Sequence, residues 1–197
     1  MARRHLILAA AALLLAGSSA QAQISTILTA PKTLIDRAIE ARSVHDIAED
    51  NRIVAEINAA MAEMGTIKAS TEIYEQRLLI TGIFSDKATY DGFLQKVKAV
   101  KGVKKLYWHV LFMSDADQKA AHLQSWAETV AMGTKAQARL VGTAGVADVN
   151  FRVTADSTGT LYLLGRARSA EEARKALARV RDGDKVKKVV DYVDVRP

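Results

Sequence analysis

The chain has 197 residues, no cysteine and a formal net charge of +6. Without cysteine it forms no disulfide and carries no thiol redox chemistry, and we do not expect a lipoprotein anchored through an N-terminal cysteine. Its length suits one ordinary domain or two small ones, which must be held together by packed cores.

The first residues have the pattern of a secretory signal. Two arginines precede an unbroken apolar run over residues 6–16, and Ala20-Gln21-Ala22 fits a cleavage site. The run is shorter than the roughly 20 apolar residues that a membrane-spanning helix needs, which disfavours a retained anchor. We therefore predict a signal peptide over residues 1–22 and a mature protein exported to the periplasm.

Before the first strand, the pattern predicts two helices. Residues 31–45 should form a short helical segment, because Pro31 suits a first helical turn and apolar residues follow at helical spacing. Asp50 is expected to cap the next helix, which carries an apolar stripe and ends near Gly65.

The first module then continues as a hairpin, a helix and a strand. Alternating apolar residues predict the strands, and an apolar face at helical spacing predicts the helix. The expected elements are strands at 67–73 and 77–84, a helix capped by Ser85 or Asp86 and ended by Gly102, and a strand at 103–113.

The second module follows a connector that looks mostly helical. Ser169 and Glu172 have the spacing of a capping box, which predicts a helix start. A weaker helix is expected at 134–141, strands at 149–154 and 160–167, a helix from 170 to 180 and a strand at 186–195. Each module should pack two helices on one face of a three-stranded sheet, which gives an α+β fold.

An internal repeat underlies this division. A repeat defines the structural unit, so we predict one small module built twice. Residues 78–113 align without a gap with 161–196, which places Gly82 on Gly165, Leu78 on Leu161, Val97 on Val180, and Val103-Lys104-Lys105 on Val186-Lys187-Lys188. The predicted domains are a signal peptide at 1–22, a helical segment at 31–45, a first domain at 46–113, a connector at 114–133 and a second domain at 134–197.

The two repeated stretches resemble the BON domain, a family named for bacterial osmotically inducible and nodulation proteins. The resemblance rests on LLITGIFSD and GVKKLYWHV within residues 78–110, and on LYLLGRARSAEEA and KVKKVVDYV within residues 161–193. With the predicted signal, the tandem copies are similar to periplasmic dual-BON proteins, which include an osmotically inducible soluble protein and an outer-membrane lipoprotein that binds anionic phospholipid. The resemblance implies a protein that binds anionic phospholipid surfaces and supports envelope integrity under osmotic stress.

The chain departs from that family in three respects. Lys185 stands where BON domains keep a glycine, and the helix expected at 134–141 is poor in large apolar residues. The acylated cysteine of the lipoprotein relatives is absent. The soluble relatives are therefore the closer analogy.

No group of residues predicts catalysis or a cofactor. The histidines are not paired at metal-ligand spacing, and Asp115-Ala-Asp117 stands at a helix start, where acidic residues are expected. The stretch Gly142–Gly145 lacks the lysine and the preceding strand of a phosphate loop. We therefore expect a non-enzymatic protein without metal or cofactor. Export and the lack of aromatic residues among the basic ones also disfavour nucleic acid as a partner.

Basic residues are concentrated in equivalent parts of the two copies. Residues 83–105 hold six Lys or Arg against two acids, and residues 166–188 hold nine against four. Anionic headgroups attract such residues at about 1 kcal/mol each, although a solvated helix face has the same composition. A protein–protein or chaperone-like module that docks on an envelope or secretion protein is the alternative function.

The two tryptophans have different expectations. Trp108 alternates with apolar residues and should lie in the core, where its counterpart is Asp191. Trp126 precedes the second module and would either dip into lipid or pack between modules. The expected lipid-binding residues are Trp126, Arg174, Arg181, Lys185, Lys187 and Lys188.

Overall fold

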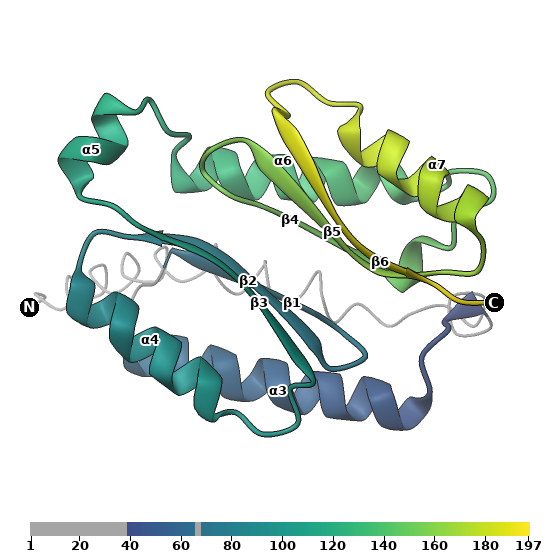
Figure 1. Cartoon of the computed structure of the whole chain (residues 1–197), viewed down its shortest axis with the longest axis horizontal. Coiled ribbons are helices and arrows are strands. Elements are labelled where there is room, and N and C mark those ends of the chain that lie inside the picture. Colours follow the sequence, from purple (N-terminus) through teal and green to yellow (C-terminus); the bar gives the residue numbers. More distant parts are fainter. Residues whose placement is uncertain (1–38, 66–67) are drawn as a thin grey trace, which may run out of the picture. The chain divides into compact units, whose positions relative to one another are not determined.

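The computed structural model describes residues 39–65 and 68–197. The predicted signal peptide, its cleavage site and most of the segment expected at 31–45 lie outside these residues. The described part contains two three-stranded sheets with helices, so the α+β class is confirmed (Figure 1). Its elements are α3 (Val44–Glu63), β1 (Ala69–Tyr74), β2 (Arg77–Phe84), α4 (Lys87–Ala99), β3 (Lys105–Phe112), α5 (Asp115–Ala120), α6 (Trp126–Leu140), a 3-10 turn (Asp148–Asn150), β4 (Phe151–Ala155), β5 (Thr160–Ala167), α7 (Ala170–Arg181) and β6 (Lys188–Val195).

The elements repeat in the same order, which defines a first module (residues 44–112) and a second module (residues 126–195). In each sheet the first two strands are antiparallel and the third is parallel to the second. The register repeats too, because Leu78 pairs with Leu106 in one sheet and Leu161 pairs with Val189 in the other.

The glycine shared by the two copies marks a close approach of neighbouring strands. A Cβ atom on Gly82 would lie 2.5 Å from the Lys68 carbonyl oxygen. A Cβ atom on Gly165 would collide with the Asn150 carbonyl oxygen in the same way. Both modules therefore need glycine at this position of their central strand.

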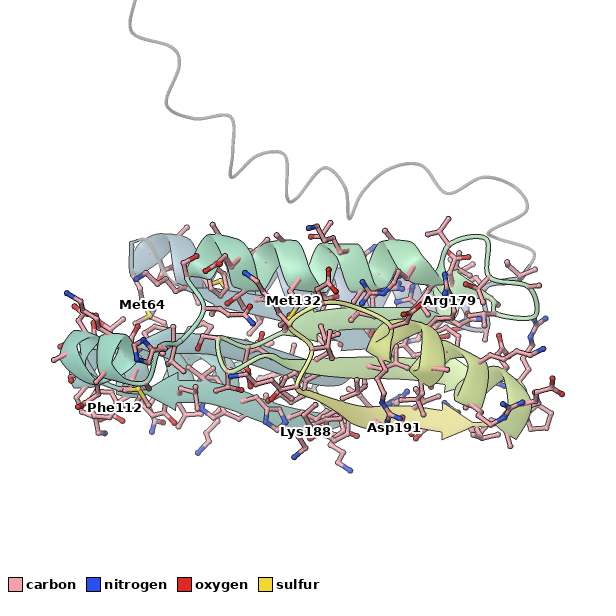
Figure 2. All side chains as sticks on the ribbon, turned by 90° about the horizontal axis from the view of Figure 1, so that it is seen from above. Met64, Phe112, Met132, Arg179, Lys188 and Asp191 are labelled. Atoms are coloured by element: carbon pink, nitrogen blue, oxygen red, sulfur yellow. The ribbon has the colours of Figure 1, made fainter. Side chains whose placement is uncertain are left out.

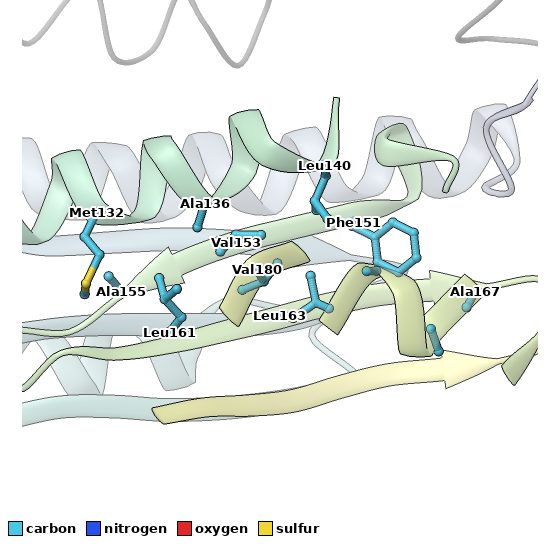
Figure 3. Packing of buried hydrophobic residues seen from close by; sticks show 12 residues of the cluster. Met132, Ala136, Leu140, Phe151, Val153, Ala155, Leu161, Leu163, Ala167 and Val180 are labelled. Carbon is cyan, nitrogen blue, oxygen red and sulfur yellow. The ribbon is translucent and has the colours of Figure 1, made fainter. Parts of the chain in front are cut away.

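Each module buries the apolar face of its helices against one face of its sheet. In the first module Ile53 and Ile57 of α3 join Phe93 and Val97 of α4 over the sheet. In the second module α6 and α7 supply the helical side of a cluster that Figure 3 shows in detail. Burial of each such side chain contributes about 1.5–3 kcal/mol to the free energy of folding. These two clusters therefore stabilise a chain that has no disulfide. The labelled members in Figure 3 are Met132, Ala136, Leu140, Phe151, Val153, Ala155, Leu161, Leu163, Ala167 and Val180.

The opposite faces of the two sheets form a further cluster, which we call the inter-sheet core. Tyr74 and Leu79 of the first module are buried together with Tyr162 and Leu164 of the second. The Thr81 and Thr154 hydroxyl oxygens lie 3.1 Å apart in the same layer. As a result β2 is buried along its whole length rather than on one face. The half-buried residues packed against this core are Tyr107, Val190 and Tyr192.

The helix expected to start at Asp50 begins earlier, at Val44. Ser43 caps it, because its hydroxyl accepts a hydrogen bond from the Asp46 amide at 3.0 Å. Asp50 lies inside the helix with no exposed surface, and its carboxylate accepts hydrogen bonds from the amides of Glu75 and Gln76 at 2.9 and 2.7 Å. The prediction that Asp50 is a cap was therefore wrong, because its side chain binds a turn distant in sequence.

The helix expected at 134–141 also begins earlier, at Trp126, so the boundary drawn at 133/134 falls inside α6. Ser125 and Glu128 form a complete capping box at its start. Gly133 lies inside this helix, and it is buried where α6 packs on β4. A single glycine inside a helix costs about 1 kcal/mol relative to alanine, which the rest of the helix tolerates.

The capping box predicted at Ser169 is only half formed. The Ser169 hydroxyl accepts from the Glu172 amide at 3.1 Å, as expected. The Glu172 carboxylate, however, accepts from the amides of Ala147 and Arg168, each at 2.8 Å. Glu172 is buried, and its carboxylate links α7 to the loop before β4 through the hydrogen bond from Ala147.

Candidate functional site

The basic residues predicted in the second module are all exposed. Arg174 and Arg181 lie on α7, Lys185 and Lys187 lie in the loop after it, and Lys188 is the first residue of β6. We call these five residues the second-module basic surface. Figure 2 shows Lys188 and Asp191 along β6 and Arg179 on α7.

The local sequence of α7 directs its arginines outward. Ala173, Ala176 and Val180 face the core at helical spacing, which leaves Arg174 and Arg181 on the solvent side. The neighbouring basic residues of α7 are partly neutralised, since Lys175 pairs with Glu171 at 2.9 Å and Arg179 pairs with Asp182 at 3.1 Å. Within the described ranges, Arg174 and Arg181 form no ion pair, so their charges face solvent.

Lys185 connects the loop after α7 to the start of α6. Its Nζ atom lies 3.0 Å from Oε1 of Glu128, and its backbone takes the left-handed conformation, with φ of 67°. The Ser125 amide and Lys185 together lower the pKa of Glu128 to about 2. Lys185 therefore already holds a carboxylate, and part of its charge is neutralised.

Trp126 opens α6 and is half-buried. Glu128, which binds Lys185, follows two residues later on the same helical turn, so Trp126 and Lys185 belong to one end of the second module. Lys187 lies at this end as well, against Gly159 of the β4–β5 turn.

Arg174 lies seven residues before Arg181, about 10 Å along the helix axis. The predicted residues thus form a cluster at the end of the module, with Arg174 as an outlier.

Trp108 lies where the sequence pattern placed it. It packs against the core of the first module, and its indole Nε1 donates a hydrogen bond to the Tyr90 hydroxyl at 3.0 Å. Its counterpart Asp191 is exposed, and the Asp191 carboxylate accepts from the Val193 amide at 2.8 Å. An acid is tolerated there because the strand edge lies at the surface.

The structure also identifies charged residues that the sequence reasoning did not single out. Arg77, Lys104, Lys105 and Arg196 line one cleft where the two modules meet. The sequence pattern shows Arg77 only as the first residue of a strand, because its hydrogen bonds to the second module are made 88 and 115 residues away in sequence. The repeated Val-Lys-Lys was the available signal for the two lysines.

Histidine and acidic residues do not assemble into a metal site in the described part of the chain, where no group of three or more potential ligands occurs. Asp117 instead takes part in the cap of α5, where its amide donates to the Ser114 hydroxyl at 3.1 Å. His109 lies between the modules, with its ring 4.3 Å from that of Tyr162. No helix among residues 39–65 and 68–197 is long and apolar enough to cross a membrane.

Comparison with known families places a BON domain at residues 131–197, from within α6 to the end of the chain. The matched region contains the whole second-module basic surface.

Similar proteins were found among curated sequences and solved structures. A protein of Anaplasma centrale, described as "Uncharacterized protein in gshII 5'region", is 25% identical over 155 residues, covering 75% of this chain and 95% of that protein. The C-terminal domain of CdsD, a structural protein of the type III secretion system of Chlamydia trachomatis, is 14% identical with a TM-score of 0.30, covering 74% of this chain and 98% of the other. A second CdsD structure is 16% identical with a TM-score of 0.29, covering 74% and 93%. Both TM-scores are too low to add to the assignment of fold or function.

Proposed function

We propose that this chain is a non-enzymatic protein of the bacterial envelope that binds anionic phospholipid surfaces through the second-module basic surface. The observation that carries the proposal is the coincidence of that surface with the BON domain at residues 131–197, a domain associated with membranes and phospholipids. The repeated order of elements supports the interpretation of the first module as a second BON domain. Export to the periplasm and a role under osmotic stress belong to the same proposal.

The expected affinity is weak and reversible. Basic residues near an anionic leaflet contribute about 1 kcal/mol each, and Arg181, Lys187 and Lys188 are exposed at one end of the module. Lys185 contributes after it releases Glu128, which the field of many headgroups would favour. Trp126 lies at the same end, and its half-exposed ring would add interfacial contact. Adsorption of this kind should weaken steeply with salt.

Liposome co-sedimentation tests the proposal. Wild-type protein should sediment with vesicles that contain phosphatidylglycerol at low salt, and it should remain in solution with phosphatidylcholine vesicles. The variant K185E/K187E/K188E should lose most of this binding. The control K98E/K101E/K119E carries the same change in net charge at exposed positions outside the second module, and should bind substantially better than the first variant. Equal loss in both variants would show that only net charge matters.

Docking on an envelope protein is the competing function, and one feature favours it. Phe112 and Val195 hold equivalent positions at the ends of β3 and β6, and they are 48% and 49% exposed. Both strands lie at sheet edges, where pairing with another chain is possible. If F112S/V195S abolished capture of a specific envelope protein while vesicle binding stayed unchanged, this function would replace the lipid-binding one.

A further inference from the structure

A cleft of about 470 Å³ lies where the two modules meet, at the end of the sheets opposite Lys188. The first module contributes the start of α3, the β1–β2 turn and the residues that precede and begin β3. The second module contributes the end of β6 and the residues that follow it. The lining residues are Asp46, Glu75, Arg77, Lys104, Lys105, Asp194 and Arg196.

The β1–β2 turn at this cleft is held in an unusual conformation. Glu75 and Gln76 both have positive φ, 51° and 62°, although neither is glycine. The buried carboxylate of Asp50 holds the turn by accepting hydrogen bonds from both amides and from the Gln76 side chain at 2.9 Å. Positive φ at both central residues is the favoured geometry of a two-residue hairpin turn, where glycine or asparagine more often stands. Here it fixes the direction in which Glu75 and the adjacent Arg77 enter the cleft.

Each carboxylate in the cleft already has partners. Glu75 lies between Arg166 at 3.6 Å and Arg196, with which it also forms an ion pair. Asp194 lies 3.3 Å from Arg77 and 3.6 Å from Arg196. The acids are therefore neutralised by arginines, and they offer little repulsion to an anion.

Asp46 is the remaining acid, and it belongs to the cap of α3. Its carboxylate accepts a hydrogen bond from the Ser43 hydroxyl at 2.6 Å. This bond lowers the pKa of Asp46, and Lys104 contributes to the shift through its charge. Its negative charge is thus balanced in part by a local hydroxyl and a lysine.

The two lysines supply the positive charge that is not held in an ion pair. Lys104 and Lys105 are exposed, and neither forms an ion pair with a carboxylate among the described residues. Their backbone is nevertheless fixed, because the Lys104 amide donates to the Gln76 carbonyl at 2.9 Å. The lining of the cleft holds four cations and three acids, and Arg166 pairs with Glu75 from outside the lining.

Arg77 adds a buried donor group beside the lysines. It is only 8% exposed, and its Nη atoms donate to the carbonyls of Tyr192 at 2.9 Å and Gly165 at 2.7 Å. Its Nε atom is buried and has no acceptor in the described structure. A guanidinium placed in this way is rigid, and it raises the positive potential at the base of the cleft.

We propose that this cleft binds a single phosphate-type anion, with Lys104 and Lys105 as the main contacts and Arg196 closing the site from the second module. The bound group would be a free phosphate or the phosphate of a lipid headgroup. Because both modules contribute, binding would also stabilise their contact. This site is separate from the second-module basic surface and does not depend on it.

The repeat offers an internal comparison. The counterparts of Glu75, Gln76 and Arg77 are Thr158, Gly159 and Thr160, so the other end of the sheets lacks the arginine and the strained turn. Lys187 and Lys188, the counterparts of the two lysines, lie at that end. They belong to the second-module basic surface, so K187Q/K188Q separates binding to vesicles from binding in the cleft.

Calorimetric titration of the whole chain tests the proposal, in low-salt buffer free of phosphate. Two ligands are used in turn: inorganic phosphate, and a short-chain phosphatidic acid below its critical micelle concentration. We expect K104Q/K105Q to weaken binding at least about tenfold, because two charge-assisted contacts are lost. K98Q/K119Q, which changes two exposed lysines outside both the cleft and the second-module basic surface, should keep the affinity of the wild type, and both variants should fold because all four lysines are exposed.

Each outcome of the titration has a definite meaning. Binding of both ligands, lost in K104Q/K105Q alone, supports a site for the phosphate group itself. Binding of only one ligand, lost in K104Q/K105Q, supports the site. The ligand that binds then shows whether the bound phosphate group is free phosphate or belongs to a lipid. Absence of saturable binding for both ligands, or equal loss in the two variants, overturns the proposal. Vesicle binding should be weakened more by K187Q/K188Q than by K104Q/K105Q. A failure of the lipid-binding proposal can therefore be distinguished from a failure of the cleft proposal.

Discussion

His109 of the first module and Tyr192 of the second share a hydrogen bond, with 2.7 Å between His109 Nε2 and the Tyr192 hydroxyl oxygen. The bond lies beside the stacked rings of Tyr107 and Tyr192, whose centroids are 3.9 Å apart. A titratable group thus lies in the contact between the two modules, beside the tyrosines of the inter-sheet core. The contact should therefore respond to pH.

Burial lowers the pKa of His109 below its usual value, and the charge of Lys188 acts in the same direction, whereas Asp156 opposes it. A histidine with a lowered pKa favours the neutral form in the folded state. Its contribution to stability is complete above the unfolded pKa of about 6.5 and is lost as the pH falls below it. We expect the wild type to lose more stability between pH 7 and pH 5 than H109Q. Urea unfolding at both pH values measures this, and identical losses would contradict it.

Glu72 should have the opposite pH dependence. Burial raises its pKa to about 7, against the opposing charge of Arg152. A carboxyl group with a raised pKa favours the protonated form in the folded state, so stability falls as the pH rises from about 4.5 through 7. We expect E72Q to be more stable than the wild type at pH 8 and nearly equal to it at pH 5. Thermal unfolding across this range provides the measurement, and a constant difference between the two proteins would exclude this role.

The strained β1–β2 turn should depend on Asp50. Removing its carboxylate leaves two buried amides without an acceptor and separates Arg42, which lies 2.9 Å away, from a buried partner. Loss of one member of a buried pair costs about 3–5 kcal/mol, so D50A should unfold at a much lower urea concentration. D91A is the control, because Asp91 pairs with Lys87 at the surface and such pairs contribute about 0–1 kcal/mol. Similar losses in the two variants would refute the role of Asp50.

The repeated glycine should resist substitution in both modules. A methyl group at Gly82 or Gly165 meets the backbone of the neighbouring strand, which cannot move aside as a flexible side chain can. We expect G82A and G165A to cost about 1–3 kcal/mol each in the free energy of unfolding. G92A is a helical control that meets only the terminal carbon of Met64. It should be nearly neutral or stabilising, and a loss at Gly92 as large as at Gly82 would argue against this explanation.

Most elements could be predicted because their residues follow local periodicity. The strands at 77–84 and 160–167 match the structure at both ends, since the alternation is regular and turn residues flank it. Helix starts were less accurate. The pattern at Asp50 looked like a cap, but its carboxylate binds the distant β1–β2 turn. The start of α6 was placed too late because the capping box of Ser125 and Glu128 was not recognised.

The inter-sheet core could not be predicted from either module alone. Leu79 and Tyr162 occupy the face of each sheet that a single αββαβ unit would leave to solvent. Alternation shows which residues share a face but not what covers it. For the same reason the sequence indicated the basic residues of the second module but not the cleft around Arg77, which needs both modules. Whether those basic residues bind lipid remains a prediction.

Co-sedimentation with anionic vesicles at low and high salt tests the central proposal most directly. We expect the wild type to bind at low salt and to be released at high salt. The variant K185E/K187E/K188E should fail to bind under conditions where K98E/K101E/K119E still does. Wild-type protein that stays in solution at low salt, or binding that survives both high salt and the loss of Lys185, Lys187 and Lys188, would contradict the proposal.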